Sequence, residues 1–183
     1  YPYAKDYDTY LGRFVAAGLD LALLTGHGPN ALCDIDGLRP YVAETDVVHL
    51  GLQREPEDLE YFDAAAFDDS PIVRHPADEI RDRGADAVMK AARDHLDARA
   101  LDGFWIHLDV DVLHRDAMPA VDSPNPNGIS MAELEVLLAG LLASPAALGL
   151  NVGIYDPELD PTGDYGASLV DVLVRAISTA RPG

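Results

Sequence analysis

Two aspartates lie two residues apart in the stretch WIHLDVDVLHRDAMPAVDSP, which begins at Trp105. The stretch otherwise has the pattern of a buried strand, in which residues i and i+2 point to the same face. Asp109 and Asp111 are therefore expected to share a face, with His107 one step earlier. Neighbouring carboxylates repel, and a bound cation relieves the repulsion. Carboxylates suit Mg²⁺ or Mn²⁺, an added imidazole favours Mn²⁺, Zn²⁺ or Fe²⁺, and paired metals activate water for hydrolysis.

A proline-rich loop follows the two aspartates. The segment MPAVDSPNPNG, residues 118–128, contains Pro119, Pro124 and Pro126. Proline fixes φ and removes a backbone donor, so the loop is expected to be stiff. Such a loop, which carries Asp122, can form one wall of a small-molecule site. The alternative is that the two aspartates are solvated acids at the end of a strand.

Predicted strands alternate with predicted helices along the chain. The expected strands cover 46–51, 71–75, 103–113 and 148–155. The expected helices cover 10–25, 55–67, 85–100, 130–144 and 168–180. This alternation is typical of an α/β fold with a mostly parallel sheet and helices on both faces. Ligands bind beyond the carboxyl ends of such strands, and Asp109, Asp111 and Asp156 all fall at or near those ends.

Two helix boundaries have clear sequence signals. Ser130, with Glu133 three residues later, predicts a capping box at the start of a helix. The segment GHGPN, residues 26–30, is expected to end the first helix, because glycine and proline do not continue one. His27 within this segment is expected to be a turn residue.

The composition restricts the class of protein. The 183 residues, 48% of them apolar, suffice for one domain covering 1–183. The net charge of −19 disfavours nucleic acid and anionic membranes as partners, because both are recognised by clustered basic residues. The single cysteine, Cys33, excludes a disulfide framework within the chain. No segment reads as a membrane span or a signal peptide, so we expect a cytoplasmic protein.

The aspartate pair and its loop resemble a motif of the arginase, or ureohydrolase, family. That motif runs S-x-D-x-D-x-x-D-P-x-x-x-P-x-x-x-x-P-x-x-G-G, and its spacing matches from Asp109 through Pro119, Pro124 and Gly128 without a gap. LNVGIYDPELDP resembles the family's closing strand, which carries E-x-N-P. DVVHLGLQREPEDLEYF resembles the G-x-R-x-x-x-x-E segment, with Arg54 near the arginine. AGLDLALLTGHGPNAL resembles the glycine-bearing helix after the second metal motif, so the resemblance covers nearly the whole chain.

The resemblance implies a fold, a cofactor and a reaction. The fold would be a three-layer αβα sandwich. Asp109 and Asp111 would be ligands of a dinuclear manganese site, which activates a water to attack the carbon of a guanidino or amidino substrate. A homo-oligomer is also implied.

The chain departs from the family pattern at several positions. The first two metal motifs, G-G-D-H and D-x-H-x-D, do not occur in it. The chain therefore resembles the C-terminal part of the fold, with the N-terminal strands absent, and two Mn²⁺ ions per subunit would require ligands from elsewhere. By the resemblance, Ile154 takes the place of the E-x-N-P glutamate, Asp156 that of its asparagine, and His114 that of the D-P aspartate. Asp156, His114 and Asp122 are our candidates for substrate binding.

Two other functions fit parts of the sequence. The missing metal motifs favour a non-catalytic module, a truncated or degenerate ureohydrolase fold that serves as a subunit or a binding protein. A Mg²⁺-dependent phosphohydrolase could also use the D-x-D pair. We rank it last, because no glycine-rich phosphate loop or basic cluster accompanies the pair.

Overall fold

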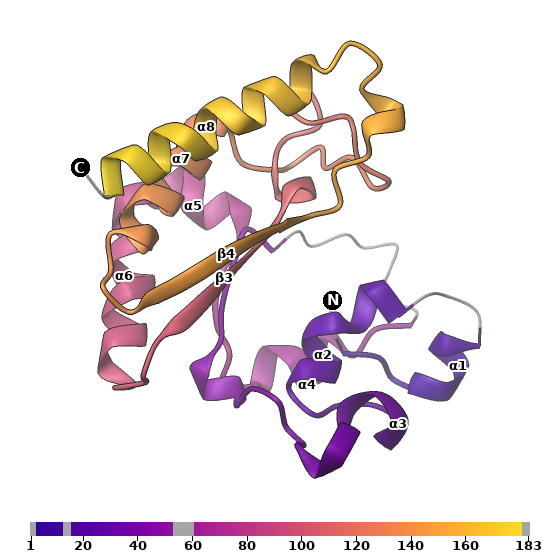
Figure 1. Cartoon of the computed structure of the whole chain (residues 1–183). Coiled ribbons are helices and arrows are strands. Elements are labelled where there is room, and N and C mark those ends of the chain that lie inside the picture. Colours follow the sequence, from indigo (N-terminus) through magenta and orange to yellow (C-terminus); the bar gives the residue numbers. More distant parts are fainter. Residues whose placement is uncertain (1–2, 13–15, 53–60, 181–183) are drawn as a thin grey trace. The chain divides into compact units, whose positions relative to one another are not determined.

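The computed structural model describes residues 3–12, 16–52 and 61–180 of the chain (Figure 1). Its contacts divide the chain into two units, which we describe separately. Unit 1 comprises residues 1–47 and 54–73, and unit 2 comprises residues 48–53 and 74–183. The prediction of a single domain is not tested by this division.

Unit 1 is built from short helices around a small core. Its elements are α1 (Tyr7–Leu11), η1 (Ala16–Leu19), α2 (Asp20–Leu24), α3 (Asn30–Cys33), η2 (Ile35–Gly37), η3 (Glu44–Asp46) and α4 (Ala64–Asp69). The core contains Ala4, Tyr10, Leu19 and Phe62. Cys33 is buried as a free thiol.

The single helix predicted over 10–25 is wrong. Two glycines interrupt its apolar pattern, and glycine is a poor helix former. Gly12 caps the end of α1, and Gly18 lies in η1, where an added Cβ would lie 2.4 Å from the hydroxyl of Tyr10. The GHGPN segment does follow the end of α2, as predicted, and Gly26 adopts a φ of +89° there.

Most of the helix predicted over 55–67 lies outside the described residues, as does Arg54. The part that is described begins only at Ala64. Residues 61–63 are not helical, because their backbone bonds to that of residues 3 and 5. Lys5 N–H donates to the carbonyl of Tyr61 at 2.9 Å, and Asp63 N–H donates to that of Tyr3 at 2.7 Å.

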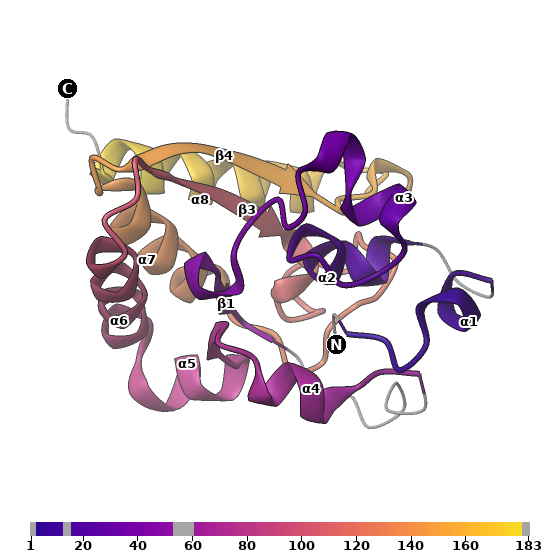
Figure 2. The same ribbon diagram turned by 90° about the horizontal axis from the view of Figure 1, so that it is seen from below.

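The described part of unit 2 combines strands with helices (Figures 1 and 2). Its helices are α5 (Ala77–Arg83), α6 (Ala85–Ala98), α7 (Met131–Leu142) and α8 (Asp164–Ala180), and its 3-10 turns are η5 (Val110–Val112) and η6 (Pro157–Leu159). The strands are β1 (Val48–Leu50), β2 (Val73–His75, whose first residue is assigned to unit 1), β3 (Phe104–Asp109) and β4 (Ala147–Gly153). β1 pairs with β2, and β3 pairs with β4 in parallel. The predicted α/β class with parallel strands is therefore confirmed.

The two faces of the β3–β4 sheet differ in burial. Ile106 and Leu108 are buried in one core with residues of α6, α7 and α8. Trp105 and Leu148, in contrast, are 61% and 67% exposed. The Trp105 indole donates to the side-chain oxygen of Asn151 at 2.7 Å, so a polar contact links the two strands on the exposed side.

The strand predicted over 103–113 ends earlier, at Asp109. The Asp109 carboxylate accepts the backbone N–H of Asp111 at 3.2 Å and caps the 3-10 turn η5. A side chain that bonds the backbone two residues later competes with the strand ladder, which explains the early end. Asp111 therefore lies in η5, and the prediction that it shares a strand face with Asp109 is wrong. His107 and Asp109 both remain in β3.

The remaining element predictions hold with small shifts. α7 starts after Ser130 with the predicted capping box, which Glu133 completes. α8 begins at Asp164, four residues before its predicted start. α5 was not predicted. Among the described residues, no helix is long and apolar enough to span a membrane.

Candidate functional site

The carboxyl ends of β3 and β4 meet at one edge of the sheet in unit 2. The parallel register places Asp109 opposite Gly153, so the loops after both strands start at the same level. These loops are joined, because the backbone N–H of Asp156 donates to the carbonyl of Ala120 at 2.9 Å. The structure thus brings Asp156 and the loop that carries Asp122 to the edge where ligands bind in open α/β sheets.

The turn that contains the two candidate metal ligands is half-buried. Asp109 ends β3, and Asp111 follows in η5. The end of β1 also packs against this turn, because a Cβ on Gly51, which has a φ of +81°, would lie 2.2 Å from a methyl group of Val112. Glycine at position 51 therefore lets a third strand end approach the turn.

Backbone hydrogen bonds hold the proline-rich loop in place. His114 N–H donates to the carbonyl of Ile129 at 2.8 Å, and Ile129 N–H donates to that of Val112 at 2.9 Å. Arg115 N–H donates to the carbonyl of Asn125 at 2.7 Å. These hydrogen bonds thus join the end of the loop, residues 125–129, to residues 112–115 at its start.

Close backbone contact at Gly128 completes this arrangement. A Cβ at this position would lie 2.3 Å from the carbonyl carbon of Leu113, which excludes any other residue without a backbone shift. From α5, the Arg81 guanidinium donates to the carbonyls of Asn127 and Gly128 at 2.5 and 3.3 Å. The glycine of the matched motif therefore has a packing role in the loop.

The three candidates for substrate binding occupy different positions at this edge. His114 is turned toward its own loop, where its Nδ1 accepts the backbone N–H of Asp116 at 3.2 Å. The Asp156 carboxylate accepts the backbone N–H of Glu158 at 2.8 Å and caps η6. The side chain of Asp122 is exposed. Asp122 is thus the most accessible of the three.

The residues at this edge do not complete a metal site. Within residues 3–12, 16–52 and 61–180, no three side chains of His, Cys, Asp or Glu are placed to hold a metal ion. A dinuclear centre needs more ligands than Asp109 and Asp111 supply. Any such centre would therefore have to take its other ligands from outside the described residues.

Sequence reasoning missed a buried acid after β4. Ile154 adopts a left-handed φ of +72°, which is rare for a β-branched residue and turns the chain sharply. Asp160 is 5% exposed and accepts hydrogen bonds from the Tyr155 hydroxyl and from Gly166 N–H, both at 2.8 Å. The Gly166 bond chiefly holds the pKa of Asp160 below its ordinary value. The acids of DPELDP look alike in sequence, and only the fold shows which one anchors the start of α8.

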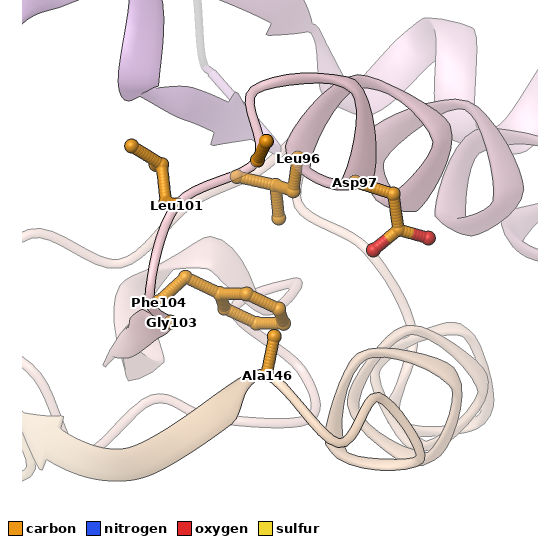
Figure 3. Close-up of a pocket in the computed structure, with 7 residues that line it drawn as sticks. Leu96, Asp97, Leu101, Gly103, Phe104 and Ala146 are labelled. Atoms are coloured by element: carbon orange, nitrogen blue, oxygen red, sulfur yellow. The ribbon is translucent and has the colours of Figure 1, made fainter.

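A pocket of about 130 Å³ lies at the opposite ends of the same strands (Figure 3). Its lining includes Leu96, Asp97, Gly103, Phe104 and Ala146. Because Gly103 and Ala146 directly precede β3 and β4, this pocket is at the amino ends of the strands. It is separate from the edge that carries Asp109.

Comparison with known proteins identifies the family. The family profile described as "Arginase family" matches residues 34–178, which is most of the chain. The chain belongs to the arginase family. Among curated members of the arginase family, the arginase of Bacillus subtilis (strain 168) is 27% identical over 161 residues, which are 85% of this chain and 51% of that protein. The formimidoylglutamase of Aeromonas hydrophila is 29% identical over 106 residues, 56% of this chain and 33% of its own length.

A solved structure from the arginase family shares the fold. The crystal structure of the Bacillus subtilis arginase superposes with a TM-score of 0.75 at 24% identity, and the match covers 87% of this chain and 53% of that one. The chain thus spans about half the length of the Bacillus subtilis arginase. The predicted resemblance and the α/β fold class are both confirmed.

Proposed function

We propose that this chain forms part of a metal-dependent hydrolase that cleaves a non-peptide C–N bond of a guanidino or amidino compound. The observation that carries the proposal is the position of Asp109 at the carboxyl end of β3, followed by Asp111 in η5, in a chain of the arginase family. The two aspartates would be ligands of a dinuclear manganese site. Because the described residues offer no third ligand, we assign no chemical step to this chain alone.

The substrate-facing part of the site would be the joined loops beyond β3 and β4. The hydrogen bond between Asp156 and Ala120 holds these loops together. Asp122 is exposed on one of them, and a carboxylate there favours a cationic head group such as a guanidinium. Asp156 and His114 lie on the same loops and would shape the site. The names of the curated relatives, arginase and formimidoylglutamase, support this substrate class.

The experiment uses the complete gene product, loaded with Mn²⁺ and assayed for urea or amide release from a panel of guanidino and amidino compounds. We expect Asp109→Asn to reduce turnover at least about a thousandfold, because the loss of a charged ligand disrupts the metal site. Asp102→Asn is the matched control, since Asp102 is an exposed acid just before β3. Metal analysis should find two Mn²⁺ per subunit. Full turnover by Asp109→Asn would refute the assigned role.

One observation favours the alternative, a non-catalytic module. The described residues contain no group that could hold a metal ion by itself. If the complete gene product binds no transition metal and releases no product from any compound of the panel, the module is the better description. A homo-oligomer and a cytoplasmic location remain proposals for either function.

A further inference from the structure

Unit 1 contains an open cavity of about 410 Å³, and all of its lining residues belong to that unit. Three carboxylates and three aromatic rings dominate its lining, which includes Tyr3, Tyr7, His27, Glu44, Asp63 and Asp69. No lysine or arginine is among the described residues that line it. Its volume falls within the range of roughly 300–1,000 Å³ that is typical of small-molecule sites.

One wall of the cavity is held rigid by a hydrogen-bonded group. The Tyr3 hydroxyl donates to Oε1 of Glu44, and Nε2 of His27 contacts the same oxygen at 2.9 Å. The rings of Tyr3 and His27 lie 4.3 Å apart between centroids, and Phe67 packs edge-on against Tyr3 at 5.5 Å. Burial, assisted by Glu44, raises the pKa of Tyr3 to about 12. The hydroxyl therefore stays protonated, and Glu44 stays the acceptor.

The other acids of the cavity differ in how far they are already engaged. Asp63 accepts the backbone N–H of Ala66 at 3.0 Å and caps α4. Asp69 is exposed and has no hydrogen bond or ion pair within the described part of the chain. Tyr7 is half-buried beside these acids, and burial chiefly raises its pKa to about 12. The lining of the cavity thus offers one unengaged carboxylate and a neutral aromatic ring.

We propose that this cavity binds a small organic cation with a protonated amine or a guanidinium as its head group. Carboxylates pair with such cations through charge-assisted hydrogen bonds, and aromatic faces attract them through the ring quadrupole. Among the described residues that line the cavity, no lysine or arginine is present to neutralise the acids. A metal ion fits less well, because the described residues hold no three-ligand group. The site does not depend on the hydrolysis proposed above.

The test is calorimetric titration of the whole chain with methylguanidinium, methylammonium and methylurea. Methylurea has nearly the same shape as methylguanidinium but no charge. We expect saturable binding of at least one cation, and at least about tenfold weaker binding of methylurea, which corresponds to about 1.4 kcal/mol. The tighter of the two cations identifies the preferred head group. Equal affinity for methylurea, or no saturable binding of either cation, would overturn the proposal.

Two variants and one control connect the binding to the cavity. Asp69→Asn removes a charge without removing a hydrogen bond or ion pair within the described residues, so the variant should fold and bind the cation several-fold more weakly. Glu44→Gln should also weaken binding several-fold, because it removes a second negative charge from the lining, with folding checked by circular dichroism. Asp20→Asn is the control, since Asp20 is an exposed acid of unit 1 outside the cavity. Wild-type affinity in Asp69→Asn and Glu44→Gln, or an equal loss in Asp20→Asn, would contradict a specific site.

Discussion

Asp109 has a structural role that does not depend on a metal. Its carboxylate accepts the Asp111 N–H and caps η5, so its orientation is set by the chain itself. Removing the side chain would lose this cap, which is worth about 1 kcal/mol. Asparagine keeps an acceptor oxygen and removes the charge. Asp109→Asn is therefore a cleaner probe of metal binding than Asp109→Ala.

Gly128 is expected to tolerate no side chain. A Cβ there would meet backbone atoms of Leu113 and His114 at 2.3 and 2.4 Å, and backbone cannot move aside as a flexible side chain can. We predict that Gly128→Ala lowers the free energy of unfolding by roughly 3 kcal/mol, the upper end for overpacking. Urea denaturation followed by far-UV circular dichroism measures this value.

Gly163→Ala is the control for the change at position 128. Gly163 has a φ of +76° and no atom within 4 Å of its would-be Cβ. Gly163→Ala should lower the free energy of unfolding by only about 1–2 kcal/mol, because only the left-handed backbone conformation is unfavourable for alanine. Equal losses in the two variants would mean that the backbone contact at Gly128 is not the cause.

His49 is expected to make stability depend on pH. Burial, with a smaller effect of Arg74, lowers the pKa of His49 from 6.5 to about 4 in the folded chain. The unfolded state therefore binds more protons between these values, and stability falls as the pH drops from about 6.5 to about 4. The loss is on the order of 3 kcal/mol. Above pH 6.5 the contribution of His49 is constant.

Urea denaturation of wild type and His49→Phe at pH 7.5, 6.0 and 5.0 isolates this effect. Phenylalanine has a similar shape and does not titrate. The stability difference between the two proteins should shift in favour of the variant as the pH falls. A difference that is the same at all three pH values would show that His49 titrates normally.

At the scale of elements, α7 begins at a capping box that the sequence predicts. Ser130 and Glu133 bond each other's backbone N–H groups at 3.2 and 2.7 Å. We predict that Ser130→Ala and Glu133→Ala each lower the free energy of unfolding by about 1 kcal/mol. Because both belong to one capping box, the double variant should lose less than the sum of the two. Strictly additive losses would show that the two residues act separately.

Elements whose signals are local could be predicted from the sequence. The capping box of α7 and the apolar run of β3 lie within a few residues, and both elements were found. The helix predicted over 10–25 failed because its apolar spacing continues across Gly12 and Gly18. The predicted end of β3 is wrong because one side chain, that of Asp109, caps η5 and ends the strand there.

In the candidate sites too, only the features with a local sequence signal could be predicted. The spacing of Asp109 and Gly128 was sufficient to find the family and the loop. The contact between Tyr3 and Glu44 joins residues 41 positions apart, and no local sequence pattern predicts it. The hydrogen bond between Asp156 and Ala120 is also long-range. Such contacts follow from the packing of the whole unit, so single-sequence patterns do not contain them.

At the scale of the whole molecule, the incomplete ligand set has a measurable consequence. A metal that binds only the native state stabilises it. Since the described residues offer no three-ligand group, Mn²⁺ at about 100 µM should leave the melting temperature of this chain unchanged within about 1 °C. The complete gene product, if it supplies the missing ligands, should gain several degrees by the same thermal scan. An equal gain in this chain would mean that it holds the metal unaided.

In the proline-rich loop, the residues that stabilise the fold differ from the residue that a ligand would meet. Backbone pairs join residues 112–115 to residues 125–129, and Arg81 donates to the second of these segments. Asp122 lies between these segments, exposed. Its replacement therefore costs the fold little, while any ligand at the strand ends meets the new side chain. The tip of this loop is a place where selection can change what the protein recognises without first having to repair how it folds.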